Sequence, residues 1–318
     1  MPKNIKSVKL QSQPIKIRKG YYLHKGQLYV PRFSSVASSV GSSDGLIQWG
    51  AGEGGKAVML QLHRHIVKLH DMIVASDPHS IEFSKKLIEP SSINWACETG
   101  KSGYKSELTR VCDWGSNVHK AIENWLKKID SDLTLSENEN VALNTFIEFW
   151  DDVQFDVLFS EMSLTTLEPF PVGGTLDFGV EIKEAHLKKL LPYIASRQAP
   201  IVEGVYIMDL KTGSYYRDKC ILQMACYKKL YEANYKRKVN GALIVNIHRD
   251  SAEEIKLYSY GKDELEEVGD TKLPACYNAW ETCIAPKWYK EELNEWKNKD
   301  DISDLEKTGV DPITEEYL

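Results

Sequence analysis

Val205-Tyr-Ile-Met-Asp209-Leu-Lys211-Thr-Gly213 is the stretch that decides the fold. It is an apolar, β-branched run that ends in a Thr-Gly turn, the pattern of a buried strand. Because side chains alternate faces along a strand, Asp209 and Lys211 point the same way while Leu210 points into the core. An acid and a base on one side of a strand end suit the binding of a divalent cation and an attacking water.

Three further motifs surround this strand. Gly173-Gly-Thr-Leu-Asp177 opens a second apolar run over 174–182 and brings a second carboxylate. Gln223-Met-Ala-Cys-Tyr227 lies in a helical pattern over 218–235, which places its Gln and Tyr on one face. The amphipathic stretch 113–126 likewise holds His119 and Glu123 four residues apart on one helical face.

In this order, the motifs resemble those of the RecB-like branch of the PD-(D/E)XK nucleases. The matching patterns are Gly-x-x-x-His at 115–119, Gly-x-x-Asp at 174–177, Asp-x-Lys at 209–211 and Gln-x-x-x-Tyr at 223–227, and the resemblance covers roughly 93–260. It implies an α/β fold with a restriction-endonuclease-like αβββαβ core, a mixed central sheet flanked by helices, here preceded by a helical N-terminal region. It further implies a metal-dependent deoxyribonuclease, an exonuclease that processes DNA ends in recombination, repair or phage replication.

The resemblance also assigns roles to individual residues. The catalytic residues that it implies are Asp177, Asp209, Lys211, Gln223 and Tyr227. The ligands that it implies for Mg²⁺ or Mn²⁺ are His119, Asp177, Asp209 and the Leu210 backbone carbonyl, with Glu161 and Glu123 as further candidates. An imidazole among oxygen ligands shifts the preference toward Mn²⁺. The basic residues expected to contact DNA are Arg217, Lys219 and Lys228.

Other interpretations of the same residues stay open. His119 could make a core contact, Glu161 could be a solvated strand residue, and Gln223 with Tyr227 could satisfy the backbone of the sheet. The chain could also be a catalytically idle DNA-binding or recruitment module of the same fold, or a subunit that contacts other proteins through its termini. The intact Asp, Asp and Lys favour catalysis, because a module that does not cut has no physical need for all three.

The remaining pattern predicts a mostly regular α/β chain. Strands are expected at 155–167, 174–182, 202–210, 241–247 and 255–260, with a hairpin over 21–30. Helices are expected over 56–92 with a break near Asp77-Pro78, and over 113–126, 137–150, 218–235 and 271–283. The stretch 183–200 has a helical character that departs from the family, and it could face DNA or be an inert surface helix. The histidines at 63, 65 and 70 have no acidic or cysteine partner, so no metal site is expected there.

Charge is distributed unevenly along the 318 residues, whose net charge is −6. Residues 1–43 carry basic side chains and no acid, whereas the last thirty or so residues are rich in acid. We therefore expect a basic arm, hairpin and helical region over 1–92, a nuclease core over 93–286 and an acidic tail over 287–318. The arm could bind phosphates, or both termini could simply be solvated.

Cysteine use and hydropathy bound the remaining possibilities. The six cysteines include no Cys-x-x-Cys pair and lack the clustered downstream cysteines of iron–sulfur relatives, so no iron–sulfur cluster is expected. No apolar run reaches membrane length, so no membrane partner is expected. The chain is expected in the cytoplasm of a bacterial or phage-infected cell, with DNA as its partner and a recombination or replication protein as a further candidate partner.

Overall fold

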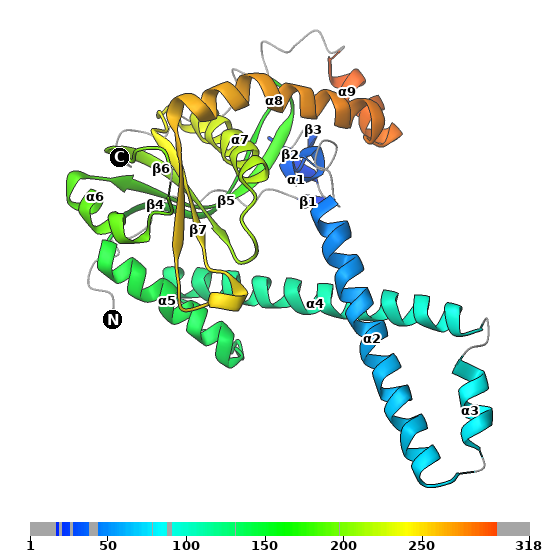
Figure 1. Cartoon of the computed structure of the whole chain (residues 1–318). Coiled ribbons are helices and arrows are strands. Elements are labelled where there is room, and N and C mark those ends of the chain that lie inside the picture. The colour runs from blue at the N-terminus through cyan, green and yellow to red at the C-terminus, as the bar shows by residue number, and fades with distance from the viewer. Residues whose placement is uncertain are drawn as a thin grey trace. The chain divides into compact units, whose positions relative to one another are not determined.

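Figure 1 shows the protein as a computed structural model, which describes residues 17–18, 21–25, 28–37, 44–77, 79–87, 91–130, 132–196 and 198–297. Contacts divide the chain into two units. The larger comprises Met1–Gly41 with Asn117–Leu318, and the smaller comprises Ser42–Ser116. This division differs from the predicted boundaries at 92 and 286. Most of the predicted basic arm, and the acidic tail beyond 297, lie outside the described residues.

A five-stranded mixed sheet forms the centre of the larger unit (Figure 1). In spatial order its strands are β4 (Asp156–Thr166), β5 (Val172–Ile182), β6 (Gly204–Lys211), β7 (Gly241–Asn246) and β8 (Lys256–Gly261). β6 and β7 are parallel, and the other neighbours are antiparallel. Every residue of β7 is buried, as its apolar sequence demands. The five predicted strands are confirmed to within two residues.

Helices cover both faces of this sheet. α7 (Arg217–Tyr235) makes the crossover between the parallel strands β6 and β7 and packs on one face. α5 (Glu137–Val153) lies on the other face, where Phe146 and Trp150 contact Phe178 of β5. A capping box between Ser136 and Glu139 fixes the start of α5. The short helices α6 (Glu184–Leu190) and η1 (Leu191–Tyr193) form the predicted helical insert, and η2 (Arg249–Ser251) follows β7. The larger unit is thus an α/β structure with a mixed sheet flanked by helices.

Gly174 explains the close approach of α7 to β5. A Cβ at this position would lie 2.7 Å from Cε1 of Tyr227 and 3.2 Å from Cδ1 of Leu230. Any side chain larger than hydrogen would therefore push α7 away from the sheet. The first Gly of the Gly-x-x-Asp motif is a packing requirement, and it sets the distance between the strand that carries Asp177 and the helix that carries Gln223.

An N-terminal hairpin also belongs to the larger unit. It consists of β1 (Ile17–Arg18), β2 (Tyr21–His24) and β3 (Leu28–Pro31), followed by α1 (Phe33–Ala37). The pairing of β2 with β3 confirms the predicted hairpin. Two side-chain hydrogen bonds attach it to the sheet: Tyr22 Oη to Thr175 Oγ1 at 3.0 Å, and His24 Nδ1 to Thr165 Oγ1 at 2.8 Å.

The first part of the predicted acidic tail, residues 287–297, is a helix that packs on the core. α8 (Lys262–Cys283) starts nine residues before the predicted helix, and α9 (Lys287–Lys297) follows it. Tyr289 and Leu293 of α9 are buried, and the hydroxyls of Tyr289 and Tyr277 lie 3.0 Å apart. Trp288 meets the ring of Tyr21 at 4.9 Å. The prediction weighed the acids of this stretch and overlooked its helically spaced aromatic residues, and α9 packs against the core beyond the predicted boundary at 286.

In its described residues, the smaller unit consists of α2 (Asp44–Val74), α3 (Ser80–Leu87) and the first part of α4 (Ser91–Lys127). α2 begins twelve residues and α4 twenty-two residues before the predicted starts at 56 and 113, because glycines there allow a close helix crossing. A Cβ on Gly54 would lie 3.1 Å from the carbonyl oxygen of Gly100, and one on Gly103 only 2.2 Å from Cβ of Ala57. The glycine run at 50–55 is therefore helical. No helix in the described ranges is long and apolar enough to span a membrane.

Candidate active site

Two carboxylates lie where strands β5 and β6 stop pairing. The ladder runs from Ile182 opposite Gly204 to Phe178 opposite Met208, and the next residues in register are Asp177 and Asp209. Beyond this point, the backbone N–H of Leu210 donates its hydrogen bond to a side chain of β5, Oδ2 of Asp177, at 2.8 Å. The end of the ladder is thus a fork with one acid on each strand.

Asp209 lies in a polar network with Lys211 and α7. Its Oδ1 accepts a hydrogen bond from Nε2 of Gln223 at 2.7 Å, and its Oδ2 makes an ion pair with the ammonium of Lys211. Lys211 also donates to Oε1 of Gln223 at 3.0 Å, and Gln223 Nε2 lies 2.9 Å from the hydroxyl of Tyr227. The structure therefore brings together the acid, the base and both residues of the Gln-x-x-x-Tyr motif.

His119 reaches the same place from α4. Its Nδ1 lies 3.9 Å from Oδ2 of Asp177, and its ring makes a hydrogen bond to the backbone of Leu210. Burial lowers the pKa of His119, and the charge of Asp209 only partly opposes this effect. A largely neutral imidazole is the form that can bind a metal.

Glu161 and Glu123 border this cluster on its other side. Glu161 has φ = 50°, a left-handed conformation inside β4, at the position opposite Asp177 where the pairing of β4 with β5 is interrupted. Such backbone is costly for a residue other than glycine and tends to occur at functional sites. Burial and the charge of Glu123 raise the pKa of Glu161 to about 7. Glu123 itself makes ion pairs with Lys120 at 2.9 Å and Lys127 at 2.7 Å.

Negative charge therefore accumulates at the fork. Burial raises the pKa of Asp177 well above its usual range, and the charges of Asp209 and Glu161 add to the rise. Burial opposes the charged form of Lys211 as well, but the neighbouring carboxylates of Asp209 and Asp177 raise its pKa overall. Asp209 and Asp177 share the ammonium of Lys211, so the fork is electrostatically suited to a further cation.

The donor chemistry fits a hard divalent cation. Carboxylates, a backbone carbonyl and an imidazole are ligands that Mg²⁺ and Mn²⁺ accept. Asp209 Oδ2 is buried and has no hydrogen-bond partner in the described part of the chain, its neighbour being the Lys211 ammonium. However, no three His, Cys, Asp or Glu side chains of the described residues already enclose a metal position. Side-chain adjustment, above all of Lys211, would have to accompany metal binding.

The three basic residues expected to contact DNA have different surroundings. Arg217 makes an ion pair with Glu264. Lys219 is exposed, with its ammonium 5.6 Å from the ring centre of Tyr216. Lys228 is only 3% exposed and makes ion pairs with Glu232 at 2.7 Å and Glu266 at 3.2 Å, so in this conformation it cannot reach a phosphate.

Asn246 is a site residue that the sequence reasoning missed. Its Nδ2 donates to the carbonyl oxygens of Lys211 at 2.9 Å and Gly213 at 2.8 Å, which fixes the turn directly after the lysine. The available signal was the single polar residue at the end of the apolar run 241–247, since a buried Asn requires hydrogen-bond partners.

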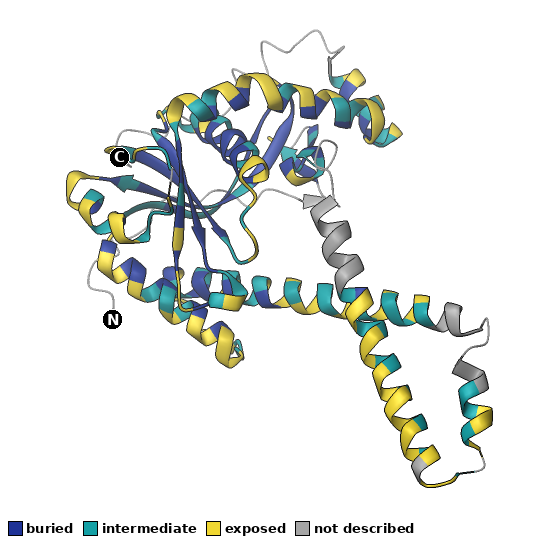
Figure 2. Cartoon of the chain, in the orientation of Figure 1, coloured by how far each residue is buried: buried dark blue, intermediate teal, exposed yellow. Residues whose placement is uncertain are grey.

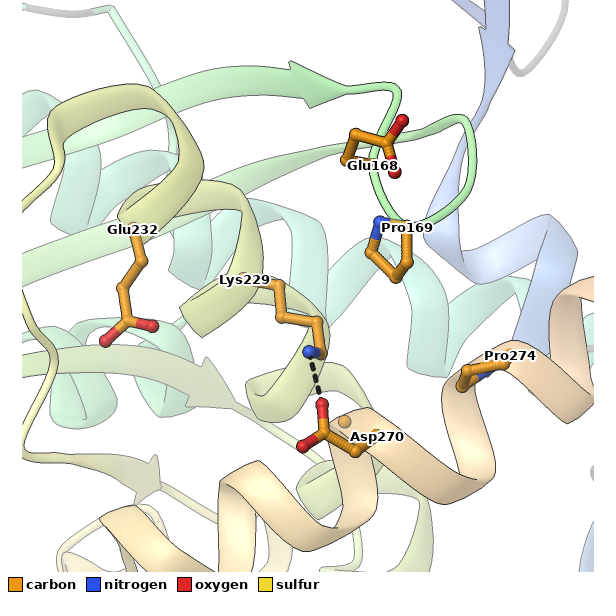
Figure 3. A pocket seen from close by; sticks show the side chains of 7 residues that line it. Glu168, Pro169, Lys229, Glu232, Asp270 and Pro274 are labelled. Atoms are coloured by element: carbon orange, nitrogen blue, oxygen red, sulfur yellow. Dashed lines mark hydrogen bonds and ion pairs between the residues drawn. The ribbon is translucent and has the colours of Figure 1, made fainter.

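A separate pocket of about 430 Å³ lies between the β4–β5 loop, α7 and α8 (Figure 3). Glu168, Pro169 and Glu232 line it, and Lys229 and Asp270 meet across it at 2.7 Å. None of the residues at the fork contributes to its wall. The pocket is therefore distinct from the carboxylate cluster.

Known proteins show little similarity to this chain. No protein-family model and no curated protein matches the chain. Among solved structures, the chain is similar to a protein from Eubacterium rectale described as a putative exonuclease, with 12% sequence identity and a TM-score of 0.32. The alignment covers 56% of this chain and 74% of the other. A likeness of this strength carries no argument about function.

Proposed function

We propose that this protein is a metal-dependent nuclease that hydrolyses DNA phosphodiester bonds at the fork between β5 and β6. The observation that carries the proposal is the convergence of Asp177 and Asp209 across the fork, with Lys211 and Gln223 bonded to Asp209 and His119 beside Asp177. These residues come from four separate elements, and a structural role for any one of them would not require the others.

The element order supports a PD-(D/E)XK type of core. A helix precedes the antiparallel strands β4, β5 and β6, the crossover helix α7 follows, and β7 then returns parallel to β6. Apart from the inserted α6 and η1, this order is compatible with the αβββαβ core that the sequence resemblance implies, and Asp177 and Asp209, the ligands that it implies, lie at adjacent strand ends. We therefore assign the chain to this fold as part of the proposal.

Each residue at the fork has a role in this mechanism. His119, Asp177, Asp209 and the Leu210 carbonyl would hold Mg²⁺ or Mn²⁺, which when bound neutralises phosphate charge and acidifies water. Glu161 lies beside these groups as a further candidate ligand, whereas the lysine pairs of Glu123 make it a poorer one.

Lys211 supplies positive charge where the scissile phosphate would become more negative. Its ammonium is held between Asp209 and Oε1 of Gln223, so it is positioned before substrate arrives. Gln223 orients both partners at once, and its contact with the hydroxyl of the largely buried Tyr227 limits its rotation. Gln223 and Tyr227 are thus positioning residues in this mechanism, and Lys211 is the catalytic residue.

Processing of DNA ends is the form of nuclease activity that we propose. The test is incubation of the full chain with end-labelled linear DNA and with closed circular DNA, single- and double-stranded, in Mn²⁺ or Mg²⁺. We expect progressive shortening of linear DNA, no loss of circles, and a roughly thousandfold lower rate for Lys211→Ala. Full activity of Lys211→Ala would refute the assignment of the site.

A second candidate function is a catalytically idle DNA-binding module of the same fold. The ion pair between Lys211 and Asp209 favours it, because in this conformation the ammonium lies against the carboxylate that a metal would need. Wild-type protein that binds DNA without cleaving it in either metal would establish this alternative.

A further inference from the structure

α2 carries a regular apolar row that the described residues leave uncovered. Met59, Leu62, Ile66, Leu69 and Ile73 follow one another at spacings of three and four residues. Met59 is 64% exposed, Ile66 53% and Ile73 60%, and Leu62 and Leu69 are partly buried. Figure 2 shows the largely exposed surface of this helix. We call these five residues the α2 seam.

The seam lies beside the row of contacts that α2 makes within the smaller unit. α4 meets α2 at Gly54, Ala57 and Val58, and Phe83 of α3 contacts His65 and Lys68. Successive residues on a helix are about 100° apart, so these positions form a row of their own beside the seam. The seam is therefore not the surface on which α3 and α4 rest.

The spacing of the seam identifies the kind of partner. Apolar residues that alternate at three and four positions form the face by which one helix packs against another. Elsewhere in the described chain, large exposed apolar side chains occur singly on their elements: Ile81, Ile129, Val141, Leu191, Val202, Tyr216 and Ile284. The matching surface for the seam is therefore the same row on a second copy of α2.

The residues that border the seam are compatible with self-association. In the heptad that the seam defines, the flanking positions are Val58, His63, His65, His70 and Met72, without Lys, Arg, Asp or Glu, and of these Val58 and His65 face α4 and α3. Two identical faces can therefore meet without repulsion between formal charges. A surface for nucleic acid would instead be bordered by Lys and Arg.

The seam is large enough for a specific contact between helices. It runs over two heptads, roughly 21 Å of helix at 1.5 Å per residue. In a two-fold contact, the five seam side chains of both copies become buried.

We propose that two copies of this protein associate through α2, seam against seam. The proposal does not depend on nuclease activity, since it rests on the smaller unit alone. Ile66 is at the middle of the row, so an acid there should disrupt the contact most strongly. Because Ile66 is exposed in the single chain, its replacement leaves the fold of one copy intact, which circular dichroism can verify.

The test is the mass of the full chain in solution, measured by light scattering and sedimentation over a range of concentrations. We expect twice the chain mass of 36.2 kDa, and a dimer dissociation constant at least about tenfold higher for Ile66→Asp, with Ile66→Leu unchanged. Ile81→Asp on α3 is the matched control, because Ile81 is 67% exposed and lies outside the seam. A monomer at every concentration would overturn the proposal, as would a dimer that Ile66→Asp leaves intact or that Ile81→Asp weakens equally.

Discussion

Gln223, on the first half of α7, donates a hydrogen bond from Nε2 to Oδ1 of Asp209, at the end of β6, over 2.7 Å. The same amide accepts a hydrogen bond from Lys211 through Oε1 at 3.0 Å. One side chain thus holds an acid and a base from the neighbouring strand. The helix that connects β6 to β7 is therefore part of the site as well as part of the fold.

Replacement of Gln223 should impair catalysis more than binding. Gln223→Met keeps the length of the side chain but removes its hydrogen bonds to Asp209 and Lys211. We expect kcat to fall about 10–100-fold, as for other residues that orient a catalytic group, with KM and thermal stability nearly unchanged. Steady-state cleavage kinetics with a melting curve measure this, and an unchanged kcat would show that Gln223 merely satisfies the sheet.

Gly174→Ala should destabilise the larger unit. The added methyl would lie 2.7 Å from the ring of Tyr227, which is already held between α7 and the sheet. Overpacking of this kind costs about 1–3 kcal/mol. Gly213→Ala is the control, because a Cβ there meets nothing within 4 Å. Urea unfolding of both variants decides the question, and equal stabilities would contradict the packing account.

Much of the larger unit was predictable because its signals are local. The apolar runs at 174–182 and 241–247 are typical of buried strands, and the helical pattern at 218–235 predicts α7 to within one residue. The proximity of the candidate site residues followed from these elements, since Asp-x-Lys on a strand and Gln-x-x-x-Tyr on the next helix share one end of a sheet. The alternation of side chains along a strand does not predict the left-handed backbone conformation of Glu161 or the hydrogen bond from Asn246 to the Lys211 carbonyl.

The smaller unit was less predictable because its start and packing depend on distant partners. Glycines at 54, 100 and 103 argue against a helix in isolation, yet they permit the crossing of α2 and α4 that stabilises both.

Local preferences are also overridden in the larger unit, where Pro274 lies inside α8. In α9, the burial of Tyr289 outweighs the acidic composition of the stretch. In each case, tertiary contacts override a local preference.

Lys228 and Lys219 should respond differently to replacement. Lys228→Met removes a buried cation and its ion pairs with Glu232 and Glu266, which keep a hydrogen bond from the Val239 N–H and a 3.9 Å ion pair with Lys262, respectively. These glutamates are partly solvated, so we expect a loss of about 1–2 kcal/mol of stability. Lys219→Met should leave stability unchanged and weaken DNA binding, with a smaller salt dependence. Unfolding curves and fluorescence anisotropy measure the two effects. Weaker DNA binding by Lys228→Met at full stability would show that Lys228 does reach DNA.

The burial of His24 should make the stability of the protein depend on pH. Burial, with a smaller contribution from the charge of Lys25, lowers the pKa of His24 from 6.5 to about 4. Below pH 6.5 the unfolded chain therefore binds a proton that the folded chain does not, and stability is lost as pH falls toward about 4. The loss attributable to His24 is at most about 3 kcal/mol. Urea unfolding of wild type and His24→Gln at pH 7 and pH 4.5 should show a smaller loss in the variant, and identical losses would exclude this origin.

Binding of Mn²⁺ to the full chain, measured by isothermal titration calorimetry, tests the central claim most directly. Asp177 and Asp209 face one another across the fork, and we propose that they hold one divalent cation between them. The account predicts saturable binding to wild type and at least about a hundredfold weaker binding to Asp209→Asn, whose fold a matching melting curve would confirm. Wild-type protein that binds no metal, or Asp209→Asn protein that binds it equally well, would contradict the account.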